Sequence, residues 1–130
     1  MLIVTDIDHL VINVNDPDKS ARWYEGVLGM RREPAHGREI LYFGQQKIHL
    51  RPVGFSKQEW WTADHEAAGS QDLCFLVDAS AQAIVEHLGA CGVAVQLGPL
   101  ARDGARGKMT SVYCRDPDGS LIEIATYGAN

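Results

Sequence analysis

Hydrophobic and polar residues alternate with a period of two in several short stretches of the chain. Such alternation is typical of half-buried β-strands, because successive side chains point to opposite faces of a sheet. In residues 7–14, for example, Leu10, Ile12 and Val14 share one face. The pattern predicts strands over residues 7–14, 39–43, 47–51, 72–77, 93–97, 109–115 and 121–126.

Two other stretches are expected to form helices that end at a glycine. The first helix is predicted over residues 19–28, after a turn at 15–18 whose side-chain oxygens cap its start. The second is predicted over residues 81–90, and Gly29 and Gly92 follow the two helices as stop signals. The remaining long stretches have no clear period, so we expect a connector over 53–70 and a Gly/Arg-rich loop over 98–108.

The two halves of the chain repeat the same order of elements. A shift of 63 residues places His9 on Asp72 and Gly29 on Gly92. In the closing hairpins, residues 48–50 match residues 122–124, and Tyr42 is matched to Tyr113. The repeat predicts one α+β domain, residues 1–130, of two βαβββ modules that form an open, curved mixed sheet with helices on its convex side. We place the modules at about residues 5–52 and 71–127.

Composition and charge exclude several classes of protein. The 130 residues are 45% hydrophobic and 22% charged, which argues against a disordered or coiled-coil chain. A net charge of −5 argues against nucleic-acid binding. No targeting or membrane-spanning segment is visible, so we expect a cytoplasmic protein. Three cysteines without CxxC spacing are expected to be buried, reduced thiols.

Four residues with metal-binding chemistry occupy equivalent positions of the repeat. His9 and Asp72 lie in the opening strands, and His49 and Glu123 lie in the closing strands. Alternation places all four on the face opposite their apolar neighbours, and a pseudo-twofold axis would bring them to one spot. Imidazole and carboxylate together favour Ni, Zn, Co, Mn or Fe. The simpler interpretation is that each is a solvated residue on a half-buried strand.

Several basic and aromatic residues could contact a substrate. Lys47 and Arg51 share the face of His49, where they either attract an anionic substrate or form a solvated rim. Arg106, with Arg102, lies in the glycine-rich loop, which either folds over a ligand or is simply a mobile surface. The Trp60-Trp61 pair either lines a pocket, contacts a partner chain or is buried under the connector.

The order of elements and three motifs resemble the vicinal oxygen chelate superfamily, which includes glyoxalase I, extradiol dioxygenases, fosfomycin-resistance enzymes and bleomycin-binding proteins. The motifs are Ile7-Asp8-His9-Leu10, Trp23-Tyr24 with Val27-Leu28-Gly29-Met30, and the DPDGSLIE run of residues 116–123. The last motif is the most specific, because the superfamily commonly has such a turn before its glutamate ligand. The chain looks closer still to small glyoxalase-domain-containing, lactoylglutathione-lyase-like proteins. The resemblance implies a metal in the concave cavity and, frequently, a homodimer.

Residue by residue, the resemblance assigns roles to the same four positions. His9 matches the first histidine of the family and Glu123 its last glutamate, while His49 falls where glyoxalase I has a ligand. Asp72 stands where a histidine is usual, so it either ligates the metal, holds a water or does neither.

The activity that the resemblance implies is a metal-dependent, glyoxalase-like lyase or isomerase acting on a small substrate with adjacent oxygens. Glu123 or Asp72 would then move a proton between neighbouring carbons as the catalytic base. One alternative is an extradiol-type dioxygenase, which would need Fe(II) on two histidines and one carboxylate. Another is a metal-free protein that binds a drug. Fosfomycin-type thiol transfer ranks low, because it requires a histidine in place of Asp72.

Overall fold

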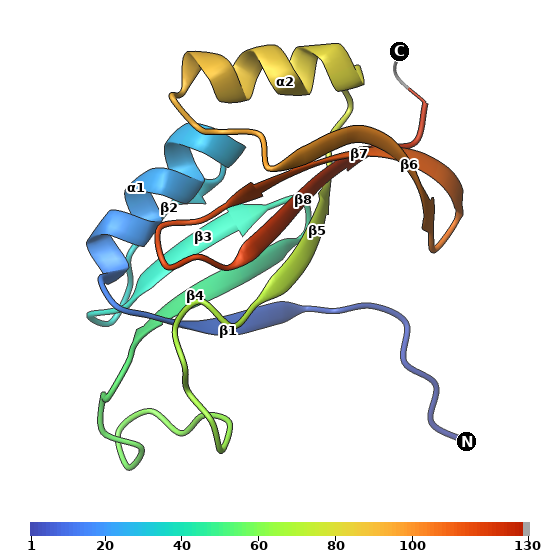
Figure 1. The fold of residues 1–130 in the computed structure, drawn as a ribbon. Coiled ribbons are helices and arrows are strands. Elements are labelled where there is room, and N and C mark those ends of the chain that lie inside the picture. Colours follow the sequence, from blue (N-terminus) through green and yellow to red (C-terminus); the bar gives the residue numbers. More distant parts are fainter. Residues whose placement is uncertain (129–130) are drawn as a thin grey trace. The chain divides into compact units, whose positions relative to one another are not determined.

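The computed structural model describes residues 1–128, and the chain divides into two compact units. Unit 1 comprises residues 1–68, and unit 2 begins at residue 69. Each unit contains one helix and one four-stranded mixed sheet (Figure 1). The predicted α+β class with two βαβββ modules is therefore confirmed.

Unit 1 builds its sheet around a central strand pair. Its elements are β1 (His9–Val14), α1 (Pro17–Leu28), β2 (Arg31–Arg32), β3 (Glu39–Phe43) and β4 (Gln46–Pro52). The strand order is β1-β4-β3-β2, with β1 parallel to β4 and the other neighbours antiparallel. Parallel pairing requires a crossover connection, and α1 supplies it.

Helix α1 begins and ends where its sequence provides caps. The side chain of Asp16 accepts a hydrogen bond from the backbone N–H of Lys19 at 3.1 Å, and Pro17 occupies the first turn, where its missing N–H costs nothing. The helix therefore starts two residues before the predicted position. Gly29 ends it with a left-handed backbone, φ 66°. Buried Tyr24 lies on the side of α1 that packs on β3 and β4.

Unit 2 repeats this plan. Its elements are β5 (Asp72–Leu76), α2 (Ala81–Ala90), β6 (Leu97–Gly104), β7 (Gly107–Arg115) and β8 (Leu121–Thr126). The strand order is β5-β8-β7-β6, with β5 parallel to β8. Ser80 caps the start of α2 by accepting from the N–H of Ala83 at 3.1 Å. Ile84 and Leu88 are the buried residues of this helix, which contacts β6, β7 and β8.

The segment of unit 2 between α2 and β7 differs from the prediction. No strand spans residues 93–97, and the expected loop over 98–108 is instead the hairpin of β6 and β7, in which Arg102 pairs with Met109. The glycines of this stretch suggested a loop, but backbone pairing with β7 overrides that local preference. Gly98 is required here, because a Cβ would lie 2.5 Å from the carbonyl oxygen of Ser111.

The strand registers confirm the internal repeat. Leu10 pairs with Ile48 in unit 1, and Leu73 pairs with Ile122 in unit 2, so the parallel ladders join the positions that the repeat makes equivalent. The match of Tyr42 to Tyr113 is wrong. Tyr42 lies opposite Lys47, whose equivalent in unit 2 is Leu121, whereas Tyr113 lies opposite Glu123, two positions further along β8. The second hairpin is one residue longer than the first, whereas the tyrosine match would require three extra residues, which a match of residue types alone does not reveal.

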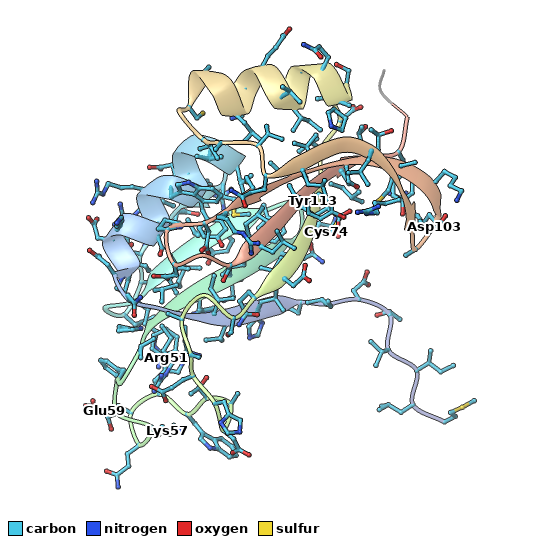
Figure 2. All side chains as sticks on the ribbon, viewed as in Figure 1. Arg51, Lys57, Glu59, Cys74, Asp103 and Tyr113 are labelled. Atoms are coloured by element: carbon cyan, nitrogen blue, oxygen red, sulfur yellow. The ribbon has the colours of Figure 1, made fainter. Side chains whose placement is uncertain are left out.

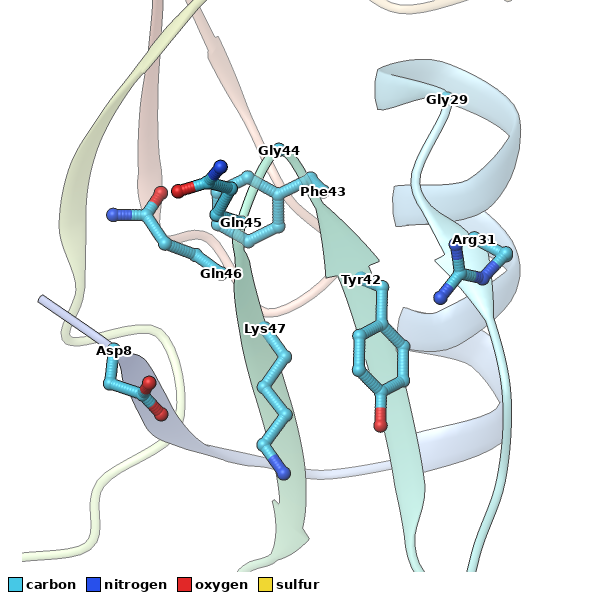
Figure 3. A pocket seen from close by; sticks show the side chains of 9 residues that line it. All are labelled: Asp8, Gly29, Arg31, Tyr42, Phe43, Gly44, Gln45, Gln46 and Lys47. Carbon is cyan, nitrogen blue, oxygen red and sulfur yellow. The ribbon is translucent and has the colours of Figure 1, made fainter.

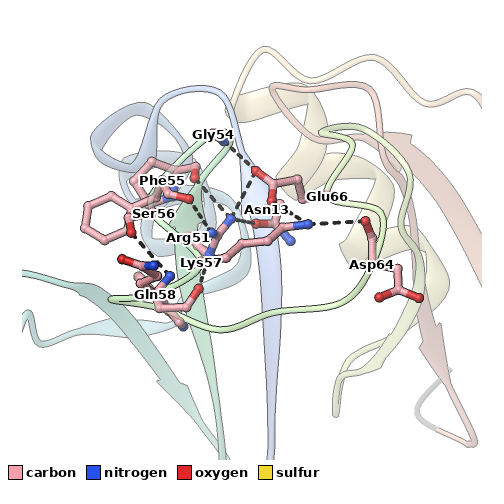
Figure 4. A network of polar contacts seen from close by, with 11 residues as sticks. Asn13, Arg51, Gly54, Phe55, Ser56, Lys57, Gln58, Asp64 and Glu66 are labelled. Atoms are coloured by element: carbon pink, nitrogen blue, oxygen red, sulfur yellow. Dashed lines mark hydrogen bonds and ion pairs between the residues drawn. The ribbon is translucent and has the colours of Figure 1, made fainter.

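A buried arginine holds the connector against the end of β4 (Figure 4). Arg51 is 0% exposed and donates from Nη1 to Asn13 Oδ1 at 2.9 Å. It also donates from Nε to the carbonyl of Trp60 at 3.2 Å and from Nη2 to that of Phe55 at 2.6 Å. The carboxylate of Glu66 lies 3.2 Å from Nη1. The prediction that Arg51 contacts a substrate is therefore wrong, because the folded connector uses its donors.

The environments of the cysteines differ from the prediction. All three lie outside any disulfide, as expected, but only Cys114 is buried, whereas Cys74 and Cys91 are exposed. Cys74 lies on the sheet face away from α2, and Cys91 caps the end of that helix. Within residues 1–128, no helix combines the length and apolar character that crossing a membrane requires.

Replacing Arg51 by Met should destabilise the protein by about 3 kcal/mol, because Glu66, Asn13 and two backbone carbonyls lose their buried donor. Urea unfolding at neutral pH measures this change. Lys57→Met is the matched control, since Lys57 also pairs with Glu66 but is exposed, and its effect should stay within about 0.5 kcal/mol. Equal effects of the two variants would contradict the assignment of Arg51 as the anchor.

Candidate functional site

In unit 1, the two histidines lie on the sheet face away from α1. Ile48 and Leu50 are buried on the face that the helix covers, so the alternation of β4 places His49 on the other face. His49 pairs with Val11 in the ladder, and His9 lies two residues before Val11 on the same side. The ring centroids of His9 and His49 are 5.6 Å apart. The predicted common face of the two histidines is confirmed.

The imidazole of His9 is oriented by a neighbouring carboxylate. Its Nδ1 lies 2.7 Å from Oδ2 of Asp8, and this bond, more than any other contact, lowers the pKa of Asp8. An ionised carboxylate only accepts hydrogen bonds, so Nδ1 must carry the proton that it donates. When the ring is neutral, Nε2 then has a free lone pair, which is the usual arrangement of a metal-binding histidine.

His49 has a different environment. Its Nδ1 is buried and has no hydrogen-bond partner among residues 1–128. Burial lowers the pKa of this imidazole, and electrostatic interactions, first with Lys47 and then with His9 and Arg38, lower it further. The ring is therefore neutral at neutral pH. A buried, unpartnered ring nitrogen costs free energy unless a donor, a water or a metal ion satisfies it.

Lys47, two residues before His49 in β4, lies on the same sheet face and lines a hollow of unit 1. It pairs with His9 in one ladder and with Tyr42 in the other, and a cavity of about 530 Å³ opens between Asp8, Arg31, Tyr42 and Lys47 (Figure 3). The guanidinium carbon of Arg31 lies 4.9 Å from the centre of the Tyr42 ring. Lys47 thus remains a candidate for contacting an anionic substrate.

In unit 2, the two carboxylates line one cavity of about 480 Å³. Glu123 pairs with Cys74, and Asp72 precedes Cys74 by two residues, so all three share the face away from α2. The hydroxyl of Ser111 donates to Glu123 Oε2 at 2.6 Å, which orients this carboxylate. Asp72 is exposed at the edge strand of the sheet.

The same cavity contains an arginine whose place the sequence did not reveal. Arg102 lines it together with Tyr113, and its Nε donates to the Tyr113 hydroxyl at 2.9 Å. Arg106 lies elsewhere in unit 2. Its guanidinium carbon is 4.4 Å from the centre of the Tyr127 ring, and it lines a separate hollow beside Leu76. The two arginines differ in their places on the β6–β7 hairpin, where Arg102 pairs with Met109. The sequence could not show this difference, because residues 98–108 have no periodic pattern that predicts the hairpin.

Cys74 does not add a thiolate to this cavity. The residue as a whole is exposed, yet partial burial of its sulfur, followed by the charge of Glu123, raises the pKa of the thiol to about 11. The thiol is therefore protonated at neutral pH. Figure 2 shows Cys74 on β5 and Tyr113 on β7. The ligand atoms that unit 2 offers to a metal are consequently carboxylate oxygens.

The donor types in each unit, taken by itself, are ones that divalent first-row metals accept. Unit 1 offers two imidazoles, one with its Nε2 left available by the bond to Asp8 and one with a buried Nδ1 that has no partner within residues 1–128. Unit 2 offers Glu123 and Asp72. For the described part of the chain, neither unit by itself groups three His, Cys, Asp or Glu side chains closely enough to hold a metal. A site of all four residues stays a prediction.

Comparison with known proteins extends over nearly the whole chain. The model of the Glyoxalase/Bleomycin resistance protein/Dioxygenase superfamily matches residues 6–124. "Virulence protein STM3117" of Salmonella typhimurium is 39% identical over 127 residues, which cover 97% of this chain and 87% of that protein. "Glyoxalase domain-containing protein RDO1" of Mycosarcoma maydis is 42% identical over 127 residues, covering 97% of this chain and 70% of that protein.

Solved structures show the same fold. An integron cassette protein from the mobile metagenome of V. cholerae superimposes with a TM-score of 0.93 at 40% identity, covering 98% of this chain and 99% of that chain. A lactoylglutathione lyase from Agrobacterium tumefaciens superimposes with a TM-score of 0.69 at 24% identity, covering 98% of this chain and 100% of that chain. At that identity the second likeness concerns the fold alone.

The contact between Cys74 and Glu123 predicts a change in thiol reactivity. Glu123→Gln removes a negative charge that raises the pKa of Cys74, so alkylation of this thiol by iodoacetamide at about pH 8 should become severalfold faster. Peptide mass spectrometry follows the reaction at each cysteine of the metal-free protein. Cys91, at the end of α2, is the internal control and should react at an unchanged rate. An unaltered rate at Cys74 would show that the two side chains do not interact.

Proposed function

The chain belongs to the Glyoxalase/Bleomycin resistance protein/Dioxygenase superfamily, and we propose that it is a metal-dependent lyase or isomerase of glyoxalase type. Its substrate is a small molecule with two adjacent oxygens. The observation that carries the proposal is the histidine pair of unit 1. The ring centroids of the two imidazoles are 5.6 Å apart; one ring is oriented by a carboxylate, and the other has a buried nitrogen without a partner in the described part of the chain.

His9, His49, Asp72 and Glu123 would hold the metal. Two neutral imidazoles and two carboxylates neutralise a dication and favour Ni, Zn, Co, Mn or Fe over Ca or Mg. When bound, the metal supplies Lewis-acid stabilisation of the negative charge that develops on the two adjacent oxygens. Asp72 is the member of the set that departs from the superfamily, because its side chain is anionic and shorter than the histidine usual there.

Glu123 is the proposed catalytic base. Its carboxylate takes the proton from the carbon that bears the hydroxyl and returns it to the neighbouring carbonyl carbon. The hydroxyl proton passes to the former carbonyl oxygen, so one carbon is oxidised and the other reduced without an external oxidant. The hydrogen bond from Ser111 orients the carboxylate for this transfer. Asp72, in the same cavity, is the alternative base.

The charges around the carboxylates favour an anionic substrate. Arg102 and Arg115 line the cavity of Asp72 and Glu123. Once the metal engages both carboxylates, the positive charge of these arginines is no longer balanced within the cavity. We propose that Arg102, oriented by Tyr113, contacts a carboxylate of the substrate, with Lys47 as a second cation. Arg106 remains a sequence-based candidate for the same task.

Metal content tests the proposal directly. Protein purified without chelator should contain about one equivalent of Ni, Zn, Co or Mn by elemental analysis, and His9→Ala or Glu123→Ala should remove it. His65→Ala, which changes an exposed histidine of the connector, should retain the metal. The metal-loaded protein should convert the adduct of methylglyoxal and glutathione, detected as thioester absorbance.

We also propose that the protein is a homodimer, as the family resemblance implies, and light scattering measures its mass in solution.

Other outcomes of this experiment point to different functions. Bound iron together with ring opening of a catechol would favour an extradiol-type dioxygenase. Absence of any metal, with tight binding of an apolar drug, would favour a sequestering protein. Metal retained in both His9→Ala and Glu123→Ala would show that these residues are not the ligands.

Arg102→Gln should raise KM for the glutathione adduct about tenfold, which corresponds to the loss of one charge-assisted hydrogen bond. The adduct with neutral 2-mercaptoethanol has no carboxylate, so its KM should change little. Lys108→Gln is the control, because Lys108 pairs with Asp103 on the exposed β6–β7 hairpin. Arg106→Gln tests the sequence-based candidate in parallel. A larger effect there than at Arg102 would reverse the assignment.

A further inference from the structure

Two adjacent tryptophans of the connector have opposite environments. Trp60 is 7% exposed, whereas Trp61 is 88% exposed. The connector contains neither helix nor strand, so the burial of Trp60 must come from tertiary contacts. Trp60 is thus buried, and it also lines a hollow of about 260 Å³ in unit 1, so the structure matches two of the three positions that the sequence allowed for it.

Trp60 lies between a cation and an imidazole. The guanidinium carbon of Arg38 stands 3.9 Å from the ring centroid of Trp60, within cation–π distance. The ring of His49 meets Trp60 edge to face, with centroids 6.0 Å apart and planes at 78°. Phe55 makes a similar contact at 6.2 Å. Trp60 is thus held by neighbours on several sides, and one of them is a proposed metal ligand.

The backbone of Trp60 is fixed as well. Its carbonyl accepts from Arg51 Nε, and its N–H donates to the carbonyl of Ser56 at 2.9 Å. Glu66, which pairs with Arg51, accepts from the N–H of Gly54 at 2.6 Å at the start of the connector. The buried charge of Arg51 therefore determines where the Trp60 ring lies.

The two histidines differ in what orients them. Asp8 orients His9 through a hydrogen bond, the common support of metal-binding histidines. The buried Nδ1 of His49 has no such partner among the described residues. Packing must replace the missing hydrogen bond, and Trp60 is the aromatic side chain of the connector in contact with this ring.

We propose that Trp60, carried on the connector that Arg51 anchors, is the positioning residue that orients His49 for metal binding. This inference rests on the proposed function. Trp60 does not touch the substrate or the metal in this role. It restricts rotation of the imidazole, so that the ligand is in place before the metal arrives and less conformational entropy is lost on binding.

Zinc affinity, measured by calorimetry on the metal-free protein, tests the inference without any assay of activity. Trp60→Leu should weaken zinc binding at least about tenfold, the typical cost of losing the support of a metal ligand. Trp60→Phe keeps an aromatic edge against His49 and should restore affinity to within about threefold. Trp61→Leu is the matched control and should bind as the wild type does.

A spectroscopic arm distinguishes positioning from a general loss of structure. Ni²⁺ bound at His49 should quench the fluorescence of Trp60, which lies 6.0 Å from that ring. Trp61→Phe should keep most of the quenching, and Trp60→Phe should lose most of it. If Trp60→Leu does not fold, Phe55→Leu replaces it, since this change removes an aromatic neighbour of Trp60 without altering a charge near His49 and should still weaken zinc binding severalfold.

The outcomes separate this inference from the proposed function. A wild-type protein that binds none of zinc, nickel, cobalt and manganese overturns both. A wild-type protein that binds zinc, with folded Trp60→Leu or Phe55→Leu binding it equally well, overturns the positioning role alone. Weaker binding in those variants, with rescue by Trp60→Phe, supports it.

Discussion

Each helix covers one face of its own sheet, and this constraint decides where chemistry can occur in either unit. The alternate residues that face α1 or α2, such as Ile48 and Ile122, are buried and apolar. Their immediate neighbours in the chain must therefore point away from the helix. His49 and Glu123 are such neighbours, and the same rule places His9 and Asp72 on the corresponding faces. Burial of the core thus assigns the candidate ligands to their side of each sheet.

The two units use the shared plan for different chemistry. Unit 1 offers imidazole nitrogens and unit 2 offers carboxylate oxygens as candidate ligands, and each set has its own support. Asp8 orients His9, Ser111 orients Glu123, and Tyr113 orients Arg102. Such neighbours matter because a ligand or cation that is already oriented loses less entropy when it binds. A repeated unit can therefore diverge in function while its strand register stays the same.

Arg51 shows how one buried charge can organise a segment that lacks regular structure. Burying a guanidinium is costly unless its donors are satisfied, and the connector satisfies them with two backbone carbonyls and the carboxylate of Glu66. The connector consequently has a defined path across the end of β4, and that path brings Trp60 to His49. A residue that looked like a substrate contact instead determines the local architecture of unit 1.

The sequence by itself determined the two helices, the repeat and the face of each candidate ligand. Caps such as Asp16 and Gly29 and the period of two act over a few residues, so they can be recognised in the chain directly. The tertiary structure alone decided that Arg51 is buried, that Arg102 belongs to a strand beside Glu123, and that Trp60 packs on His49. These outcomes depend on partners distant in sequence, such as Glu66 for Arg51 and Tyr113 for Arg102. Local periodicity carries no information about such partners, because contacts between residues far apart in the sequence form only when the chain has folded.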